Sequence, residues 1–505
     1  MKHSNKNKIL VYLNSNFITL GLIKSLKELH DCELYALVDC NNNVKQFFEK
    51  QSFVKFEKVW FYRDYVNYNE TEIDLEFLKK FENKHKLQLW QIILNDRFFY
   101  SYNEYYTFNY SEILTILSKE CKLFEQIFND INPDFTIVKQ TDLQQNDLLQ
   151  KLCIAKKIPV LTLHGTRFAK RCIISQHFED IDEKQSIIKN DSKSLEELQN
   201  LVSGISKQTS ERLDKKGLPT SGPPTFTKRL RIGFKYLTLI RNSQEHFAYK
   251  GRNFTNIVTK NLSFFLGTIR KKNFLKKHSI HKIDYQIPYV YFPLHLEPER
   301  IVSIHAPYYG NQLELIKHIA KSIPIDHILY VKDHPAMSQF GYRTISFYKE
   351  ILKLHNVKLI YESVSSEILI KNSKLVITIS GTSGLEASFF GIPVIAFGDV
   401  IYSEISTVTR IKNLEELPNI INDSLKKTYS LSELNKFTDY FLNHSFEFDL
   451  IELEEKTYSD LWYEGILDVD ISEQKMIQHH TDNQKQYEIL AREYVKKIKY
   501  FEQIS

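Results

Sequence analysis

The chain has 505 residues, of which 42% are hydrophobic and 26% are charged, with a formal net charge of +5. At roughly 100 to 200 residues per domain, this length predicts two to four globular domains and the composition excludes a disordered or fibrous chain. No segment approaches the roughly 18 consecutive apolar residues of a membrane span, and the first residues lack the pattern of a signal peptide. We therefore expect a soluble, cytoplasmic protein.

Buried-strand patterns alternate with helical apolar spacing in the first part of the chain. The predicted order is strand 8–13, helix 17–29 and strand 32–39, and later strand 133–138, helix 148–155 and strand 158–163. Short connections between such runs are typical of a parallel sheet. We predict one Rossmann-like α/β domain over residues 1–185.

Residues 186–280 are predicted to form a linker followed by a basic helical insertion. The linker contains the Gly- and Pro-rich stretch 217–224. From Phe226 to Ile280 the chain has thirteen Lys or Arg and one acid, Glu245, a balance of +12 that leaves about −7 for the rest. Positive charge concentrated in this way predicts an anionic partner.

A second α/β rhythm begins near Tyr289. Strands are predicted at 289–294, 301–305, 327–332, 357–361, 374–380 and 393–398, with helices at 312–323 and 342–354. We assign residues 281–425 to a second parallel-sheet domain. Residues 426–505 show helical spacing without strand-like runs, and we expect helices that pack over both domains.

The strongest local signal is the segment 374–398, in which a β-branched strand runs into a small polar turn and a helix. The turn and the start of the helix contain Ser380, Gly381, Thr382, Ser383, Gly384 and Glu386. Backbone N–H groups and three hydroxyls meet there at a helix N-terminus, which favours an anion such as phosphate. The alternative is a tight turn with Ser or Thr as the helix N-cap.

A second element lies upstream, where a predicted strand ends at Lys332 and Pro335 fixes the backbone after His334. Both side chains would lie at the carboxyl edge of the sheet, where open parallel sheets bind ligands. His334 taken alone would be an ordinary structural hydrogen-bonding residue. Together with the turn at 380–384, it predicts a diphosphate or phosphodiester cradle.

The series of elements from YFPLHLEPE at 291–299, through Gln312 and VKDHP at 331–335, to the segment 374–398 resembles a known family. It is similar to bacterial capsule and surface-polysaccharide glycosyltransferases of the GT-B type, the group that contains capsule Kdo transferases. The resemblance covers residues 289–400 and is only thematic in the N-terminal domain. It implies two Rossmann-like domains facing a cleft, with a nucleotide-sugar donor held by the C-terminal domain and an acceptor held by the N-terminal one.

The resemblance also implies roles for individual residues. Lys332 and His334 would contact the donor nucleotide or its phosphate, and Glu386 would contact a ribose hydroxyl. The phosphate would lie on the turn that contains Ser380, Gly381, Thr382 and Ser383. The family usually has Glu where this chain has Asp333, a departure that leaves the cradle intact.

Inverting transfer also needs a general base opposite the leaving phosphate, and this base would come from the N-terminal domain. The candidates are Asp96, Asp142 and His164, each of which also fits an ordinary loop residue. Arg167 is suited to steady anionic sugar or phosphate oxygens. The Asp-x-Asp at Asp180 and Asp182 is interpreted as a solvated acidic turn, and we expect neither a metal ion nor a cofactor.

Basic and apolar side chains alternate along the insertion 226–280. Lys228, Arg231 and Lys235 follow helical spacing beside Leu230, Phe234 and Leu237, and Phe264, Phe265 and Ile269 precede Arg270, Lys271 and Lys272. This pattern predicts helices lying on an anionic membrane, with a solvated helical excursion as the alternative. Nucleic acid is not expected, because no recognition motif accompanies the charge.

The leading hypothesis is therefore a metal-independent, inverting glycosyltransferase, peripheral to the inner face of the plasma membrane. It would transfer a sugar, with a CMP-activated acidic sugar such as Kdo favoured, to a polysaccharide or lipid-linked acceptor. Three alternatives stay open: a glycerophosphotransferase that uses CDP-glycerol, a nucleotide-sugar 2-epimerase, and a non-catalytic GT-B scaffold.

Overall fold

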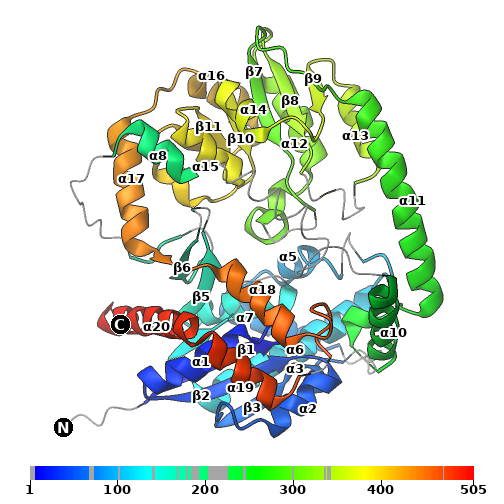
Figure 1. Ribbon diagram of the computed structural model, residues 1–505, viewed down its shortest axis with the longest axis vertical. Coiled ribbons are helices and arrows are strands. Elements are labelled where there is room, and N and C mark those ends of the chain that lie inside the picture. Colours follow the sequence, from blue (N-terminus) through cyan, green and yellow to red (C-terminus); the bar gives the residue numbers. More distant parts are fainter. Residues whose placement is uncertain are drawn as a thin grey trace.

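The computed structural model describes residues 6–67, 73–99, 103–138, 143–166, 168, 170–177, 180–183, 193–202, 226–242, 246–297, 301–334, 337, 343–469 and 471–504. Two α/β lobes are stacked along the long axis of the molecule, the N-terminal lobe below and the C-terminal lobe above (Figure 1). Each lobe is built on its own sheet, and the strands are mostly parallel. The prediction of an α/β fold with two Rossmann-like domains is confirmed.

The sheet of the N-terminal lobe has the order β13-β6-β5-β4-β1-β2-β3. Its strands are β1 (Asn7–Asn14), β2 (Cys32–Asp39), β3 (Lys58–Phe61), β4 (Phe135–Ile137), β5 (Val160–Gly165), β6 (Arg171–Ser175) and β13 (Phe446–Glu447). Strands β1 to β5 are parallel, whereas β6 and β13 pair antiparallel with their neighbours. The helices between them are α1 (Ile18–Leu29), α2 (Asn42–Lys50), α3 (Tyr62–Tyr65), α4 (Leu75–His85), α5 (Leu89–Leu94), α6 (Tyr110–Ile131) and α7 (Gln144–Ala155).

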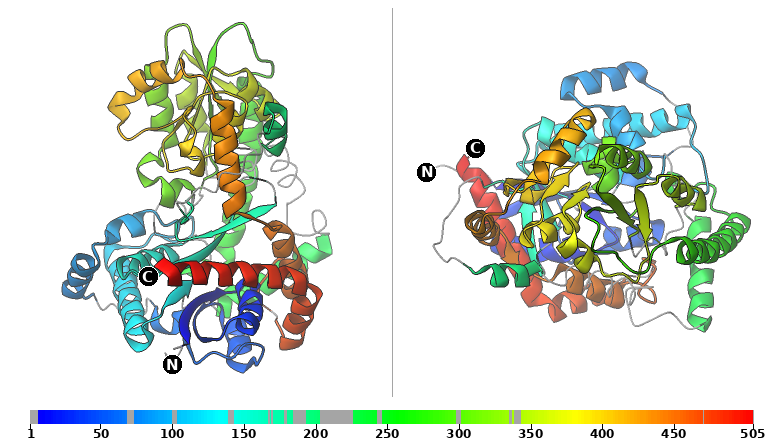
Figure 2. Two further views of the ribbon diagram at one scale, coloured as in Figure 1. Left: turned by 90° about the vertical axis from the view of Figure 1, so that its left-hand side faces the viewer. Right: turned by 90° about the horizontal axis from the view of Figure 1, so that it is seen from above.

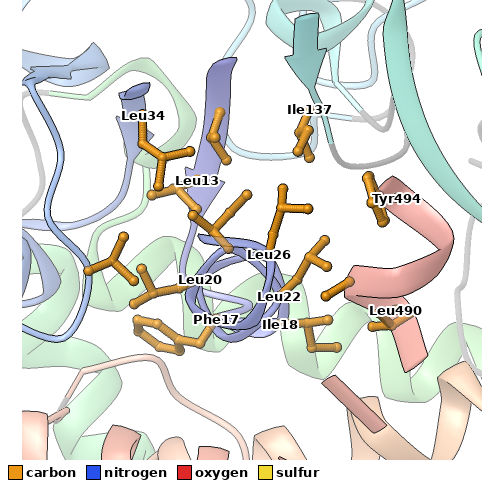
Figure 3. Packing of buried hydrophobic residues seen from close by; sticks show 14 of the residues in the cluster. Leu13, Phe17, Ile18, Leu20, Leu22, Leu26, Leu34, Ile137, Leu490 and Tyr494 are labelled. Carbon is orange, nitrogen blue, oxygen red and sulfur yellow. The ribbon is translucent and has the colours of Figure 1, made fainter. Parts of the chain in front are cut away.

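The last helix, α20 (Gln484–Ile504), completes the core of this lobe by packing against α1. Figure 3 shows Leu490 and Tyr494 beside the α1 side chains that face the sheet. The two helices approach closely because residue 21 is glycine, where an added Cβ would lie 2.5 Å from the ring of Tyr487. The end of the chain is therefore part of the first domain's core.

The sheet of the C-terminal lobe is entirely parallel, with the order β12-β11-β10-β7-β8-β9. Its strands are β7 (Tyr289–Pro293), β8 (Ile328–Lys332), β9 (Val357–Ile360), β10 (Leu375–Thr378), β11 (Val394–Ala396) and β12 (Val408–Arg410). The helices are α12 (Gln312–Ser322), α13 (Ile345–Leu352), α14 (Ser366–Asn372), α15 (Thr382–Phe389) and α16 (Leu417–Ser424). The direction of winding reverses between β7 and β10, and this switch point is where ligands bind in doubly wound sheets.

One predicted strand is wrong. Residues Ile301–His305 form a π-helical segment instead of a strand. The apolar run follows β7 closely, but both sides of β7 are already occupied, by β8 and by β10. With no free neighbour to pair with, the segment satisfies its backbone groups in a helix.

Two segments connect the lobes on the side opposite the basic insertion. Helix α8 (Leu195–Val202) and helix α17 (Leu431–His444) pack on the C-terminal lobe, where the ring of Phe441 stacks on Phe168 at 4.3 Å. The chain then returns to the N-terminal lobe through β13, which pairs with β6. The Arg171 guanidinium fixes this return by donating to the carbonyls of Leu442 and Ser445 at the end of α17. Helices α18 (Leu450–Leu461) and α19 (Glu473–Asp482) follow, and α20 lies across this lobe (Figure 2).

The basic insertion forms two helices, α10 (Phe226–Asn242) and α11 (Phe254–His278). Helix α11 runs along the outer edge of the molecule from the level of the N-terminal lobe to the C-terminal lobe (Figure 1). None of the helices in the described part of the chain is both long and apolar enough to cross a bilayer.

Candidate functional site

The switch point of the C-terminal sheet brings together a histidine and the small polar turn. His295 follows β7, and Ser380 follows β10. The His295 Nε2 atom lies 3.3 Å from the Ser380 amide nitrogen and 3.3 Å from Thr378 Oγ1. Both side chains are buried. The residue that the structure places against the turn is thus His295, which the sequence analysis did not select as a site residue.

Residue 381 has to be glycine for this turn to form. An added Cβ would lie 2.8 Å from Thr378 Oγ1 and 3.2 Å from His295 Nε2. The amide of Gly381 donates to Thr378 Oγ1 at 2.9 Å, and its carbonyl accepts from the Tyr402 hydroxyl at 2.7 Å. Gly381 is also the N-cap of α15, so that no side chain caps the first turn of the helix.

The open end of α15 is accompanied by a buried hydroxyl. Ser380 is fully buried, and its Oγ has no hydrogen-bond partner among the described residues. A buried hydroxyl without a partner is costly unless a ligand or a water satisfies it. Thr382 and Ser383 form the first turn of α15 and are partly exposed. The predicted phosphate turn therefore has the features of an anion site.

A buried ion network lies behind His295. The Arg343 guanidinium contacts the carboxylates of Asp333 and Glu297 and donates to the carbonyl of His295. Burial acts to lower the pKa of Arg343, but Asp333 and Glu297 raise it above its usual value. The hydroxyl of Tyr348 donates to the second oxygen of Asp333. Asp333, the residue at which this chain departs from the family pattern, is thus held by two partners and fixes the VKDHP loop to the switch point.

Lys332 points to the side of the sheet that α14 covers. Its ammonium donates to the carbonyl of Val364 at 2.6 Å and to Ser366 Oγ at 2.9 Å. Burial lowers the pKa of Lys332 to about 8. Ser366 is also hydrogen-bonded to the hydroxyl of Tyr291. Burial raises the pKa of Tyr291, and the nearby buried carboxylate of Glu386 raises it as well. The two predicted motifs are therefore linked through Ser366 and Tyr291.

His334 lies on the other side of the VKDHP loop. It lines a small cavity beneath α11 together with Lys271, Asp333 and Tyr348. Burial lowers the pKa of His334 to about 4, so its imidazole is neutral at physiological pH. A neutral imidazole can donate one hydrogen bond to a phosphate or nucleotide oxygen, but it supplies no positive charge.

The residues predicted as general base fall at scattered places. Asp96 is buried and accepts from the amides of Phe98 at 2.5 Å and Gln144 at 2.8 Å, and burial raises its pKa. It therefore caps the first turn of α7. His164 is buried near the end of β5. Asp142 and Arg167 lie outside the described residues.

A second buried carboxyl, Glu120 on α6, was missed in the sequence. Its Oε1 atom accepts from the Tyr62 hydroxyl and from Gln144 Nε2, and both partners are distant in sequence. Burial raises the pKa of Glu120 to about 8. The helical pattern of α6 carried a signal, because Glu120 lies three residues after Leu117 and four before Phe124, on the apolar side of the helix.

This carboxyl predicts a pH dependence of stability. The pKa of Glu120 is about 8 in the folded state and near 4.5 in the unfolded state. Between these pH values the folded protein keeps a proton on Glu120 that the unfolded protein has lost. Rising pH therefore lowers the free energy of unfolding. Glu120→Gln should remove a loss on the order of 4 kcal/mol between pH 5 and 8.5. Thermal unfolding across this range measures it. Glu125→Gln on the same helix is the control and should keep the loss, because Lys84 and His85 lower the pKa of Glu125 despite its burial. Equal pH profiles for wild type and Glu120→Gln would contradict the assignment.

The interpretation of the Asp-x-Asp as a solvated turn is wrong for Asp182. Its carboxylate pairs with Lys497 on α20 at 2.9 Å, and both side chains are at least 93% buried. The partner lies more than 300 residues away, so the sequence around Asp182 gave no sign of it. Within the described ranges, no group of three or more His, Cys, Asp or Glu is placed to hold a metal ion.

A cavity of about 710 Å³ separates the two lobes on one side. Asp147 and Lys151 on α7 line it from the N-terminal lobe, and Asp399 and Ser403 line it from the C-terminal lobe. It is large enough for a sugar ring, and its walls carry both signs of charge. The cavity opens between the lobes, as expected of a fold with two facing domains.

Taken together, the two doubly wound sheets define a protein with two Rossmann-like domains, and the uncapped helix turn lies at the switch point of the second. Residues 236–439, about two fifths of the chain, match the family model of capsule polysaccharide biosynthesis proteins. The resemblance deduced from the motifs is thereby confirmed for this part of the chain. A search of curated proteins finds no significant match to the sequence.

Three solved structures are similar to this chain at low sequence identity and low TM-score. The KpsC beta Kdo 2,7 transferase of Thermosulfurimonas dismutans is 15% identical, with 72% of this chain and 89% of that chain covered and a TM-score of 0.31. The UDP-GlcNAc 2-epimerase of Methanocaldococcus jannaschii is 14% identical, with 87% and 99% covered and a TM-score of 0.24. The N-terminal domain of a Candida albicans trehalose-6-phosphate phosphatase is 12% identical, with 95% and 98% covered and a TM-score of 0.30.

Proposed function

We propose that the protein is a glycosyltransferase of capsule polysaccharide synthesis. The observation that carries the proposal is the buried, unpartnered hydroxyl of Ser380 beside the uncapped N-terminus of α15, at the switch point of the sheet. This edge lies within residues 236–439, the part that matches the capsule family. A diphosphate or phosphodiester donor is the ligand whose charge suits such a site.

In this proposal the donor is a nucleotide sugar, with a CMP-activated acidic sugar such as Kdo favoured. Its phosphate accepts from Ser380, from the first-turn amides of α15 and from Thr382 and Ser383. Lys332 and His334 bind the nucleotide from β8, and Glu386 binds the ribose. The contacts of Lys332 and Glu386 require side-chain movements, because the Lys332 ammonium donates to Val364 and Ser366 and Glu386 is 1% exposed in the free protein.

The acceptor, a growing polysaccharide or a lipid-linked glycan, is assigned to the N-terminal lobe and the cavity between the lobes. The general base is assigned to Asp142 or His164, with Arg167 steadying anionic oxygens. Asp96 is the weaker candidate, because both of its oxygens already accept backbone amides, one from Phe98 and the other from Gln144 at the start of α7. We place the enzyme on the inner face of the plasma membrane, attached through residues 226–280.

Transfer should not need a metal ion. A helix N-terminus, hydroxyls and a lysine can stabilise the leaving phosphate without one. We expect turnover with a CMP-activated sugar and a capsule-type acceptor to survive EDTA within about twofold, with the inverted configuration in the product. A loss of turnover on chelation that magnesium or manganese restores would contradict metal independence, whereas the absence of transfer with any nucleotide sugar would contradict the enzymatic proposal itself.

A further inference from the structure

Helix α11 presents an apolar face to solvent. Six large side chains on this helix are between 44% and 64% exposed: Phe254, Val258, Leu262, Phe265, Leu266 and Ile269. We call them the α11 apolar face. Their spacing of three and four residues places them on one side of the helix over four turns. Figure 1 shows the helix at the outer edge of the molecule, and the exposed fractions of these side chains show that none of the described elements covers the face.

The orientation of this face is set by the opposite side of the helix. Lys271 is buried and donates to the carbonyl of Met337 at 3.0 Å, in the loop that follows His334. Phe274 and Leu275 pack against the core of the C-terminal lobe. Because these contacts fix the C-terminal half of α11, the helix cannot turn its apolar face inward without losing them.

The charges on α11 indicate what covers the apolar face. The helix has six Lys or Arg and no acidic residue. The exposed side chains of Lys272 and Lys276 continue the same side of the helix beyond Ile269, and Arg270 and Lys277 flank it. A long amphipathic helix with an apolar stripe, whose charged side chains are all cations, matches the surface of a bilayer that contains anionic lipid.

Helix α10 differs from α11 in this respect. Arg231 pairs with Glu464 at 3.3 Å, and the Lys235 ammonium lies 5.6 Å from the ring centre of Tyr463. Leu239 and Ile240 are buried. Part of the charge and apolar surface of α10 is therefore already used within the protein.

We propose that α11 is the element that docks the protein on anionic lipid, with the α11 apolar face lying at the level of the headgroups. This deepens the proposed function, since it names the helix and the face within residues 226–280 that bind the membrane, and it rests on an acceptor located there. The occupant is a lipid surface and not a second copy of the chain, because two copies meeting through this face would bring two exclusively basic helices together.

Sedimentation with vesicles tests the proposal without any measurement of activity. The vesicles are phosphatidylcholine alone, or phosphatidylcholine mixed with phosphatidylglycerol. The wild type should bind only the mixed vesicles, and salt should weaken binding. Leu262→Gln with Phe265→Gln should lower the partition coefficient by about 10- to 100-fold. Lys276→Gln with Lys277→Gln should lower it by about 10- to 30-fold.

The control variant is Leu75→Gln with Ile325→Gln, which removes two exposed apolar side chains elsewhere and should bind like the wild type. A Phe265→Trp variant should show a blue shift of its fluorescence on mixed vesicles. Equal binding by the wild type and the Leu262/Phe265 variant, binding to neutral vesicles alone, or a dimer that this variant dissociates would each overturn the proposal. Nucleotide binding by each variant, measured without vesicles, should stay unchanged. If the wild type itself binds no nucleotide, that result would count against the proposed enzyme and not against the membrane contact.

Discussion

Replacing Arg343 by Met is expected to lower the free energy of unfolding of the C-terminal lobe by about 3 kcal/mol. The guanidinium is 1% exposed and contacts both Asp333 and Glu297, whose side chains are 18% and 13% exposed. Methionine fills similar space but leaves two largely buried carboxylates without their cation. Removing one partner of a buried ion pair in this way costs more than replacing all of its partners by apolar residues. The midpoint of thermal unfolding, measured by circular dichroism, should fall by about 6 to 12 °C.

The matched control for this substitution is Arg410→Met. Arg410 also pairs with an aspartate in the same lobe, Asp399, at 2.7 Å, but that carboxylate is 79% exposed. Exposed pairs contribute little, so the control should cost less than about 1 kcal/mol. Equal losses in the two variants would contradict the inference that the buried network behind His295 stabilises the lobe more than an exposed ion pair does.

Replacing His334 by Ala is expected to weaken nucleotide binding by about 5- to 150-fold, which corresponds to about 1 to 3 kcal/mol. The hydrogen bond from a neutral imidazole to a charged oxygen is the interaction lost. Because the pKa of His334 is about 4, this loss should be the same at pH 6 and pH 8. A histidine with the usual pKa near 6.5 would instead contribute more at pH 6, where it gains charge.

Calorimetric titration of both proteins at the two pH values measures this effect. His327→Ala is the control, since His327 lies just before β8 at the opposite edge of the sheet. It should bind nucleotide like the wild type. Unchanged affinity in a folded His334→Ala protein would remove His334 from the donor site, and a loss confined to pH 6 would show that its imidazole is charged there.

The parallel sheets could be predicted from the sequence because their strands are short apolar runs separated by helical spacing. The turn at Ser380 and the loop at Lys332 were recognisable for the same reason, since each directly follows such a run. The segment 301–305 shows the limit of this reasoning. Its residues suit a strand, but whether a strand forms depends on a free neighbour in the sheet.

The contacts within the site could not be predicted, because they join residues that are distant along the chain. His295 meets Ser380 across 85 positions, and Arg343 joins Glu297 across 46. Lys332 reaches Ser366, and Asp182 reaches Lys497. The position of His295 directly after the central strand β7 is the one signal that could have identified it beforehand.

The central claim is that the carboxyl edge of the C-terminal sheet binds the nucleotide of a sugar donor. Thermal unfolding of the wild type with CMP, CDP, UDP or GDP tests it most directly, because a ligand that binds only the folded state raises the unfolding midpoint. CMP at 100 times its dissociation constant should stabilise the protein by about 2.7 kcal/mol, and His334→Ala should need a higher concentration for the same effect. An unfolding midpoint that none of the four nucleotides changes would contradict the claim.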